Sequence, residues 1–166
     1  MAGFVSVFRF GIRQLFSVLS SRLRKAPGRP SSSLGETLLN QLKVVIAEDN
    51  PALLSLMVDL METEFAVVAT AENGLLALKR VRKYRPDIVV LDLRMPLANG
   101  IEVARHLTKS TSKPCIVICS ADTEPEIIQL SRQAGALAYV FKLRMGRDLI
   151  AAVKAAVRGE TFVSSQ

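Results

Sequence analysis

Five short apolar runs, separated by segments with helical periodicity, constrain the fold of this chain more than any other feature of its sequence. The runs are LKVVIA (42–47), FAVVATA (65–71), DIVVLDL (87–93), CIVICS (115–120) and ALAYVF (136–141). In the middle runs the apolar residues are continuous rather than alternating, which is typical of strands with both faces buried. Sheets of this kind are parallel and carry helices on both faces. Five parallel strands are therefore predicted.

Helical periodicity occupies the intervals between these runs. The five helical patterns lie at roughly 51–63, 74–84, 100–109, 125–134 and 146–158. Pro51 directly after Asn50 suits the first turn of a helix, because the N–H that proline lacks would be unpaired there anyway. Regular alternation of strand and helix defines an α/β chain. We therefore predict a doubly wound, five-stranded parallel sheet with five flanking helices.

Composition divides the chain into four segments. Its 166 residues, 49% of them hydrophobic, can form one core with a modest appendage. Residues 1–25 lack acidic side chains, and 26–37 are rich in Pro, Gly and Ser, which is typical of a linker. Residues 38–158 hold the alternating pattern, and 159–166 form a short C-terminal tail. One folded domain is predicted, beginning near Leu38.

The positive charge is concentrated in the first forty residues. Six Lys and Arg against one Glu give residues 1–40 a net charge of +5 out of the chain's +7, which leaves +2 for the remaining 126 residues. A domain with so little net charge lacks the basic footprint of a DNA-binding surface. Direct nucleic-acid binding by this chain is therefore not expected.

The first twenty-five residues have the pattern of an amphipathic helix. The apolar stripe at helical spacing consists of Phe4, Phe8, Ile12, Leu15, Leu19 and Leu23. Arg9 and Arg13 interrupt the apolar run, so neither a membrane span nor a secretory signal fits. Weak contact of residues 4–24 with a membrane surface and an organellar transit peptide both fit. An extension caused by a start codon placed too far upstream is a third interpretation, and the sequence leaves all three open.

The two cysteines favour a reducing compartment. Cys115 and Cys119 lie four residues apart on one predicted strand. Their side chains therefore point to the same face but are too far apart to form a disulfide with each other. Buried, reduced thiols in a cytoplasmic protein are the expectation.

Polar side chains lie at or just beyond the carboxyl ends of four predicted strands. They are Glu48 and Asp49 after the first strand, Asp92 near the end of the third, Ser120 at the end of the fourth and Lys142 after the fifth. Functional groups of parallel α/β sheets collect outside the carboxyl ends of the strands. We therefore expect these five side chains to converge on one pocket.

The three carboxylates predict a divalent cation. Close together they repel one another, unless a cation shares the space, and Mg²⁺ prefers such oxygen ligands. Beside Mg²⁺, the ionised carboxylate of Asp92 can attack a phosphorus atom, and Lys142 can pair with the incoming phosphoryl group.

From about Lys43 to Gln166 the chain resembles a response-regulator receiver domain. The resemblance rests on VVIAEDNP, IVVLDLRMPLANGIEVARHL, VICSA and AGALAYVFK, in this order and spacing. It implies the flavodoxin-like version of the predicted fold. It also implies that Asp92 is the phosphoacceptor, that Asp49, Asp92 and the Arg94 carbonyl bind Mg²⁺, and that Glu48 assists through a water molecule.

The resemblance assigns roles to further residues. Ser120 would bond the phosphoryl oxygens and move toward them on activation, Lys142 would form an ion pair, and Tyr139 would be an aromatic rotamer switch. Pro96 and Gly100 would shape the loop after Asp92. The ending AAVKAAVRGETFVSSQ is similar to the last receiver helix and linker of NarL/FixJ-type regulators, whose helix-turn-helix domain the chain lacks.

The expected function is that of a two-component phosphorelay response regulator. Its partner would be a histidine kinase or phosphotransfer protein, homodimerisation would go through the receiver, and the only catalysis would be weak self-phosphorylation and dephosphorylation. Two alternatives remain open: the receiver portion of a truncated DNA-binding transcriptional regulator, and a docking module that is independent of phosphorylation.

Overall fold

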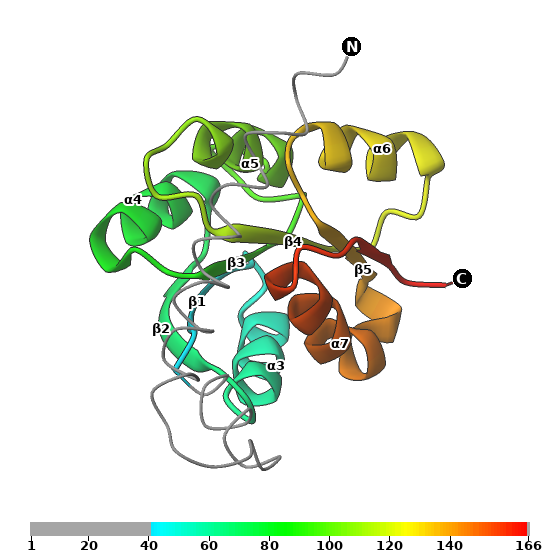
Figure 1. Ribbon diagram of the computed structural model, residues 1–166, viewed down its shortest axis with the longest axis horizontal. Coiled ribbons are helices and arrows are strands. Elements are labelled where there is room, and N and C mark those ends of the chain that lie inside the picture. Colours follow the sequence, from blue (N-terminus) through cyan, green and yellow to red (C-terminus); the bar gives the residue numbers. More distant parts are fainter. Residues whose placement is uncertain (1–40, 166) are drawn as a thin grey trace, which may run out of the picture.

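The computed structural model describes residues 41–165, so the predictions for residues 1–25 and 26–37 lie outside the described part. Strands and helices alternate along the chain (Figure 1). The elements are β1 (Lys43–Ala47), α3 (Pro51–Met61), β2 (Ala66–Ala71), α4 (Gly74–Tyr84), β3 (Ile88–Leu91), α5 (Gly100–Thr108), β4 (Cys115–Ser120), α6 (Pro125–Gln133), β5 (Ala138–Phe141), the 3₁₀ turn η1 (Lys142–Arg144), α7 (Met145–Val157) and β6 (Phe162–Val163). All five predicted strands and all five predicted helices are present.

The strands form one parallel sheet in the order β2-β1-β3-β4-β5-β6. The predicted α/β class and doubly wound parallel sheet are confirmed. The sixth strand is an addition, since β6 lies in the segment that the sequence analysis described as a C-terminal tail. A strand of two residues is too short to show a hydrophobic period, so the sequence pattern could not predict it. The pairing of β6 with β5 is seen only in the structure.

Two helical layers cover the sheet (Figure 1). Helices α3 and α7 lie on one face, where Met57, Leu149 and Val153 pack on alternate strand residues such as Val90 and Val117; we call this the α3/α7 core. Helices α4, α5 and α6 lie on the other face and pack on the intervening strand residues, which form the α4/α5/α6 core. Every residue of β3 and β4 is buried, which explains their continuous apolar sequences.

The order of the strands positions the candidate site. Strand β1 pairs with β2 on one side and with β3 on the other, so the chain winds outward from β1 in two directions. In open α/β sheets this reversal opens a crevice beyond the carboxyl ends of the two central strands. Glu48 and Asp49 follow β1 and Asp92 follows β3, which places all three at this crevice.

Asparagine caps start the helices that border the crevice. The side chain of Asn50 accepts hydrogen bonds from the backbone N–H groups of Ala52 and Leu53 at 3.0 and 3.1 Å, and Pro51 occupies the first turn of α3 as predicted. Asn99 and Glu102 form a reciprocal capping box at the start of α5. These caps hold the loops after β1 and β3 in defined positions.

None of the helices within residues 41–165 combines the length and the apolar character needed to cross a membrane.

Candidate functional site

Three carboxylates converge at the crevice, as the sequence predicts. The backbone N–H of Glu48 donates to the carbonyl of Ala71 at 3.0 Å, and that of Asp92 donates to the carbonyl of Ala47 at 2.8 Å, so the sheet itself holds both residues. Carboxylate oxygens of Glu48, Asp49 and Asp92 lie within 4.8 Å of one another. Glu48 and Asp92 are buried, whereas Asp49 is exposed at the mouth of the crevice.

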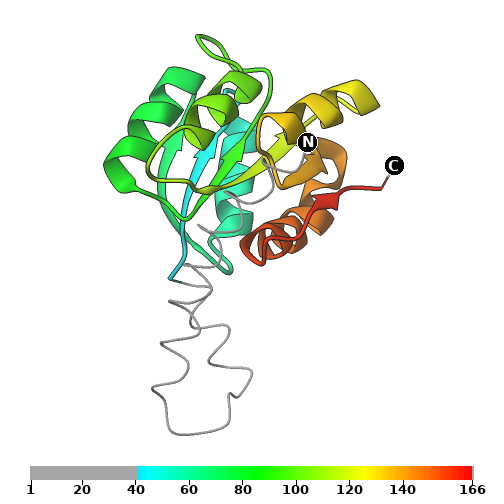
Figure 2. The same cartoon turned by 45° about the horizontal axis from the view of Figure 1, so that its top comes forward.

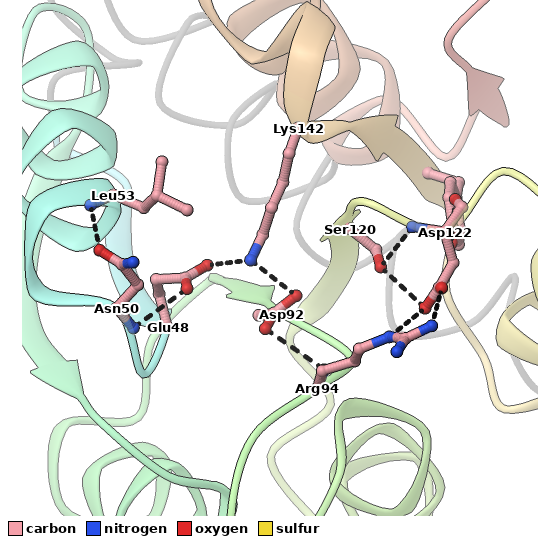
Figure 3. A network of polar contacts seen from close by, with 9 residues as sticks. Glu48, Asn50, Leu53, Asp92, Arg94, Ser120, Asp122 and Lys142 are labelled. Atoms are coloured by element: carbon pink, nitrogen blue, oxygen red, sulfur yellow. Dashed lines mark hydrogen bonds and ion pairs between the residues drawn. The ribbon is translucent and has the colours of Figure 1, made fainter.

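Lys142 bridges the two buried carboxylates (Figure 3). It is the first residue after β5, and its Nζ lies 2.8 Å from Glu48 Oε2 and 3.1 Å from Asp92 Oδ1. Burial raises the pKa of Glu48 above its ordinary value, although the bonds from Lys142 and from the Asn50 N–H act in the opposite direction. Burial alone would lower the pKa of Lys142, but its bonds to the two carboxylates outweigh burial and raise it. Lys142 therefore remains a cation at neutral pH.

The loop after β3 holds the Asp92 carboxylate from the other side. The backbone N–H of Arg94 donates to Asp92 Oδ2 at 3.2 Å, and the N–H of Gly100 donates to the carbonyl of Leu93 at 3.1 Å. A Cβ atom on Gly100 would lie only 2.2 Å from the Asp92 carbonyl oxygen. Glycine is thus required by the close approach of α5 to the backbone of Asp92.

Asp122 is a charged residue of the site that the sequence analysis did not single out. Its carboxylate forms a two-pronged ion pair with the Arg94 guanidinium, in which Arg94 Nε donates to Oδ2 at 3.1 Å and Nη2 pairs with Oδ1. The bond from Arg94 lowers the pKa of Asp122. Asp122 follows the end of β4 by two residues, so the rule that directed attention to Ser120 would have found it as well.

Ser120 is buried at the end of β4 and belongs to the group around Asp122. Its hydroxyl donates to Asp122 Oδ2 at 3.4 Å and accepts from the Asp122 N–H at 3.2 Å (Figure 3). Figure 3 shows Ser120 and the Arg94–Asp122 pair on the same side of Asp92, whose Oδ2 accepts the Arg94 N–H. The structure places Ser120 next to the acidic cluster, with its hydroxyl directed to Asp122.

Tyr139 points into the protein from the middle of β5. Its side chain is buried in the α4/α5/α6 core, its hydroxyl donates to the carbonyl of Asp122 at 2.9 Å, and its ring packs edge to face on Phe141 with centroids 5.8 Å apart. Burial raises the pKa of this hydroxyl to about 12. A single loop residue, Asp122, therefore contacts Arg94, Ser120 and Tyr139 at once.

The donor set suits a hard divalent cation. The three carboxylates offer only oxygen ligands, and their mutual repulsion is compensated in the described residues by one lysine. An exposed Asp49 beside a buried Asp92 leaves the cluster accessible from solvent on one side. This arrangement defines an α/β protein with an acidic cluster at the carboxyl ends of its parallel strands, whose oxygen donors suit a divalent cation.

Comparison with known proteins gives the family. Residues 44–154 match the response regulator receiver domain. The chain therefore belongs to the receiver-domain family of two-component systems, whose general features are phosphorylation and Mg²⁺ binding, and the predicted resemblance is confirmed. Phosphorylation-dependent signalling is the function that this membership supports.

Individual relatives agree with this assignment. The chain is 34% identical over 116 residues to the DNA-binding response regulator MtrA of Mycolicibacterium smegmatis, an alignment that covers 70% of this chain and 50% of that protein. It is 29% identical over 100 residues to the chemotaxis protein CheY of Halobacterium salinarum, covering 60% of this chain and 83% of CheY. The solved receiver domain of the response regulator NarL from Mycobacterium tuberculosis superposes with a TM-score of 0.69 at 27% identity, covering 73% of this chain and 99% of that domain. The chain thus spans about half the length of MtrA and most of CheY.

Proposed function

We propose that Asp92 accepts a phosphoryl group from the phosphohistidine of a histidine kinase or phosphotransfer protein, and that the resulting conformational change signals to a partner. The observation that supports this proposal is the position of the Asp92 carboxylate. It is buried, it is held between Lys142 Nζ and the Arg94 N–H, and it lies within 4.8 Å of the carboxylates of Glu48 and Asp49.

Asp49, Asp92 and the backbone carbonyl of Arg94 would hold Mg²⁺, and Glu48 would assist through a water molecule. Asp49 is exposed, whereas Glu48 and Asp92 are paired with Lys142, so Asp49 would be the carboxylate most open to a cation from solvent. When bound, Mg²⁺ neutralises charge on the transferring phosphoryl oxygens. The protein's own contribution is to hold the nucleophile and the compensating cation of Lys142 in fixed geometry.

The transfer step uses one carboxylate oxygen of Asp92. This oxygen forms a bond to phosphorus while the phosphorus–nitrogen bond of the phosphohistidine breaks, and the electron pair of that bond leaves with the imidazole. Lys142, 3.1 Å from Asp92, pairs with an oxygen of the new phosphoryl group. Ser120 turns its hydroxyl from Asp122 toward another phosphoryl oxygen, and water later hydrolyses the acyl phosphate.

We also expect a cytoplasmic protein with at most weak self-catalysed phosphorylation and dephosphorylation. It would form a homodimer through the receiver, and direct nucleic-acid binding by this chain is not expected. A receiver that controls a DNA-binding region is the second candidate, favoured by the similarity to the DNA-binding regulator MtrA. Sequencing the gene beyond Gln166 distinguishes the two.

Incubation with acetyl phosphate and MgCl₂, followed by intact-protein mass spectrometry, tests the proposal. The wild-type chain should gain the mass of one phosphoryl group, Asp92→Asn should gain none, and EDTA should abolish labelling of the wild type. Asp59→Asn is the matched control, because Asp59 is an exposed aspartate on α3. Labelling of Asp92→Asn to the same extent as the control would exclude Asp92 as the acceptor.

A further inference from the structure

Positive charge is unevenly distributed over the described residues. Residues 74–113, which include α4 and α5, hold nine Lys and Arg against three Asp and Glu, a net charge of +6. Residues 41–73 and 114–165 hold seven against eleven, a net charge of −4. Helices α4 and α5 are in contact and lie side by side on one face of the sheet, drawn in green in Figures 1 and 2. The excess of positive charge therefore lies on one side of the domain.

Exposed bases gather on these two helices, and we call the surface that they form the basic face. Its six members are Lys79, Arg82 and Lys83 in α4, Arg85 directly after α4, Arg105 in α5 and Lys109 directly after α5. The ion pairs within residues 41–165 all involve other bases. The one acidic residue of the two helices, Glu102, belongs to the capping box of α5. The basic face thus has no charged partner among the described residues.

The spacing of these bases is unfavourable for the helices themselves. Lys79 and Lys83 are four residues apart in α4, and Arg105 and Lys109 have the same spacing at the end of α5, so each pair lies on one side of its helix and repels. The helix dipole favours a base in the last turn, such as Arg132 in α6, but Lys79 lies before the last turn of α4. An anionic partner outside the domain would compensate this charge.

The chain enters the domain beside the basic face. The N–H of Lys43, at the start of β1, donates to Asp87 Oδ2 at 2.8 Å, and the N–H of Asp87 donates to the carbonyl of Lys43 at 2.9 Å. Asp87 follows Arg85 by two positions. The sequence that leads into β1 is also basic, since residues 1–25 contain five Lys and Arg, no acidic residue and an apolar stripe at helical spacing. Two basic parts of the chain therefore meet at the start of β1.

This end of the domain lies opposite the acidic cluster. Asp87 directly precedes β3, and its carbonyl accepts the N–H of Cys115, the first residue of β4, at 2.8 Å. The end of α4 is thus tied to the amino ends of the strands, whereas Asp92 and the other carboxylates of the cluster lie at the carboxyl ends. A partner on the basic face would leave the crevice around Asp92 open to solvent.

We propose that the basic face docks on the anionic headgroups of a lipid surface. Clusters of Lys and Arg are attracted to such surfaces, and apolar side chains beside them strengthen the contact. Leu75, which is 54% exposed, lies four residues before Lys79 on the same side of α4. Residues 1–25 combine the same two properties. A lipid surface uses both charge and apolar side chains, whereas the phosphate backbone of a nucleic acid uses the charge alone. The docking is independent of the proposed phosphorylation of Asp92.

Cosedimentation of the full chain with vesicles tests this proposal. Vesicles of equal parts phosphatidylglycerol and phosphatidylcholine should bind the wild type, and vesicles of phosphatidylcholine alone should bind it at least about tenfold more weakly. Lys79→Gln combined with Lys83→Gln should lower the partition coefficient about 25-fold, roughly fivefold for each base lost near the anionic surface.

A second double variant is the matched control. Arg147→Gln combined with Arg158→Gln removes the same charge from exposed positions outside the basic face, and it should lower the partition coefficient less than about twofold, because salt screens distant charges. An unchanged partition coefficient of the basic-face variant, or an equal loss in the control, would overturn the proposal. Tighter binding of the wild type to a DNA duplex than to the vesicles, lost in the basic-face variant, would assign the surface to nucleic acid instead.

Lysine acetylation followed by mass spectrometry tests the orientation without any substitution. On the mixed vesicles, acetylation of Lys79, Lys83 and Lys109 in the wild type should slow severalfold relative to the free protein. Lys154 is the internal control, because α7 lies on the other face of the sheet and Lys154 should keep its rate. Equal rates for all four lysines with and without vesicles, or equal slowing of all four, would contradict docking through the basic face.

Discussion

At the scale of single residues, Lys142 compensates the charge of two carboxylates, those of Glu48 and Asp92. Their side chains are only 0% and 3% exposed, and Lys142 forms an ion pair with each. Uncompensated charges in such positions are costly, because little water reaches them. A divalent cation would also compensate this negative charge, so the stability of the domain should depend on its proposed ligand.

Replacement of Lys142 by methionine should expose this cost. We expect Lys142→Met to lower the free energy of unfolding by about 3 kcal/mol, measured by urea denaturation without divalent ions. Added MgCl₂ should recover part of the loss, since the cation supplies the missing positive charge. Lys154→Met is the control: Lys154 pairs with Glu64, and both side chains are 33% exposed, so the loss should stay below about 1 kcal/mol. Equal losses in the two variants would contradict a special role for Lys142.

The two thiols give a pH-dependent prediction at the same scale. Cys115 and Cys119 are free and buried in the α3/α7 core, as expected from the sequence, and burial raises the pKa of each to about 12. A raised pKa means fewer thiolates at any pH below it, so alkylation by iodoacetamide at pH 8 should be at least about 100-fold slower in the folded protein than in urea. The folded rate should keep rising as the pH approaches 12, whereas the rate in urea should level off above the ordinary value of 9.0. Equal rates with and without urea would show that the thiols are accessible.

At the scale of elements, the start of α5 and the end of β3 depend on each other. The helix approaches so closely that only glycine fits opposite the Asp92 carbonyl, and the N–H of Gly100 returns to the carbonyl of Leu93. The periodicity of residues 100–109 predicts the helix, but not this contact. The position of Asp92 thus depends on an element that begins eight residues later in the chain.

Alanine substitutions at Gly100 and at Gly146 should separate the effect of a backbone clash from the effect of helix propensity. Gly100→Ala should destabilise the domain by about 2 kcal/mol or more and shift the amide signals of Asp92 and Leu93, because the added Cβ overlaps backbone atoms. Gly146→Ala, near the start of α7, meets no atom within 4 Å and should stabilise by roughly 0.5–1 kcal/mol through helix propensity. Urea denaturation and NMR measure both effects, and a neutral Gly100→Ala would show that α5 can move away from β3.

At the scale of the whole molecule, the acidic cluster joins segments from the first half of the domain to Lys142 at the end of β5. A ligand that binds there binds only the folded chain, and it therefore stabilises the entire domain by mass action. Unfolding in the presence of Mg²⁺ consequently reports on the site without any phosphoryl donor.

Mg²⁺ should raise the free energy of unfolding in proportion to the logarithm of its concentration above the dissociation constant, by about 2.7 kcal/mol at one hundred times that constant. Asp49→Asn should abolish this increase while changing stability without Mg²⁺ by less than about 0.5 kcal/mol, because Asp49 is exposed. Asp59→Asn, at constant ionic strength, should retain the full increase. A Mg²⁺ effect of equal size in both variants would assign the cation to another site.

The amino-acid sequence by itself determined the α/β class, the five main strands, the five helices and the set of polar residues at the strand ends. Periodicity is a local property, and the carboxyl ends of parallel strands necessarily meet at one edge, so Glu48, Asp49, Asp92 and Lys142 could be grouped before any coordinates. Only the tertiary structure decided the strand order, the burial of two of the three carboxylates, the ion pair of Arg94 with Asp122, the inward position of Tyr139 and the pairing of β6. The physical reason is that each of these features joins residues far apart in the chain, and such contacts arise from how the layers pack rather than from the pattern of any one segment.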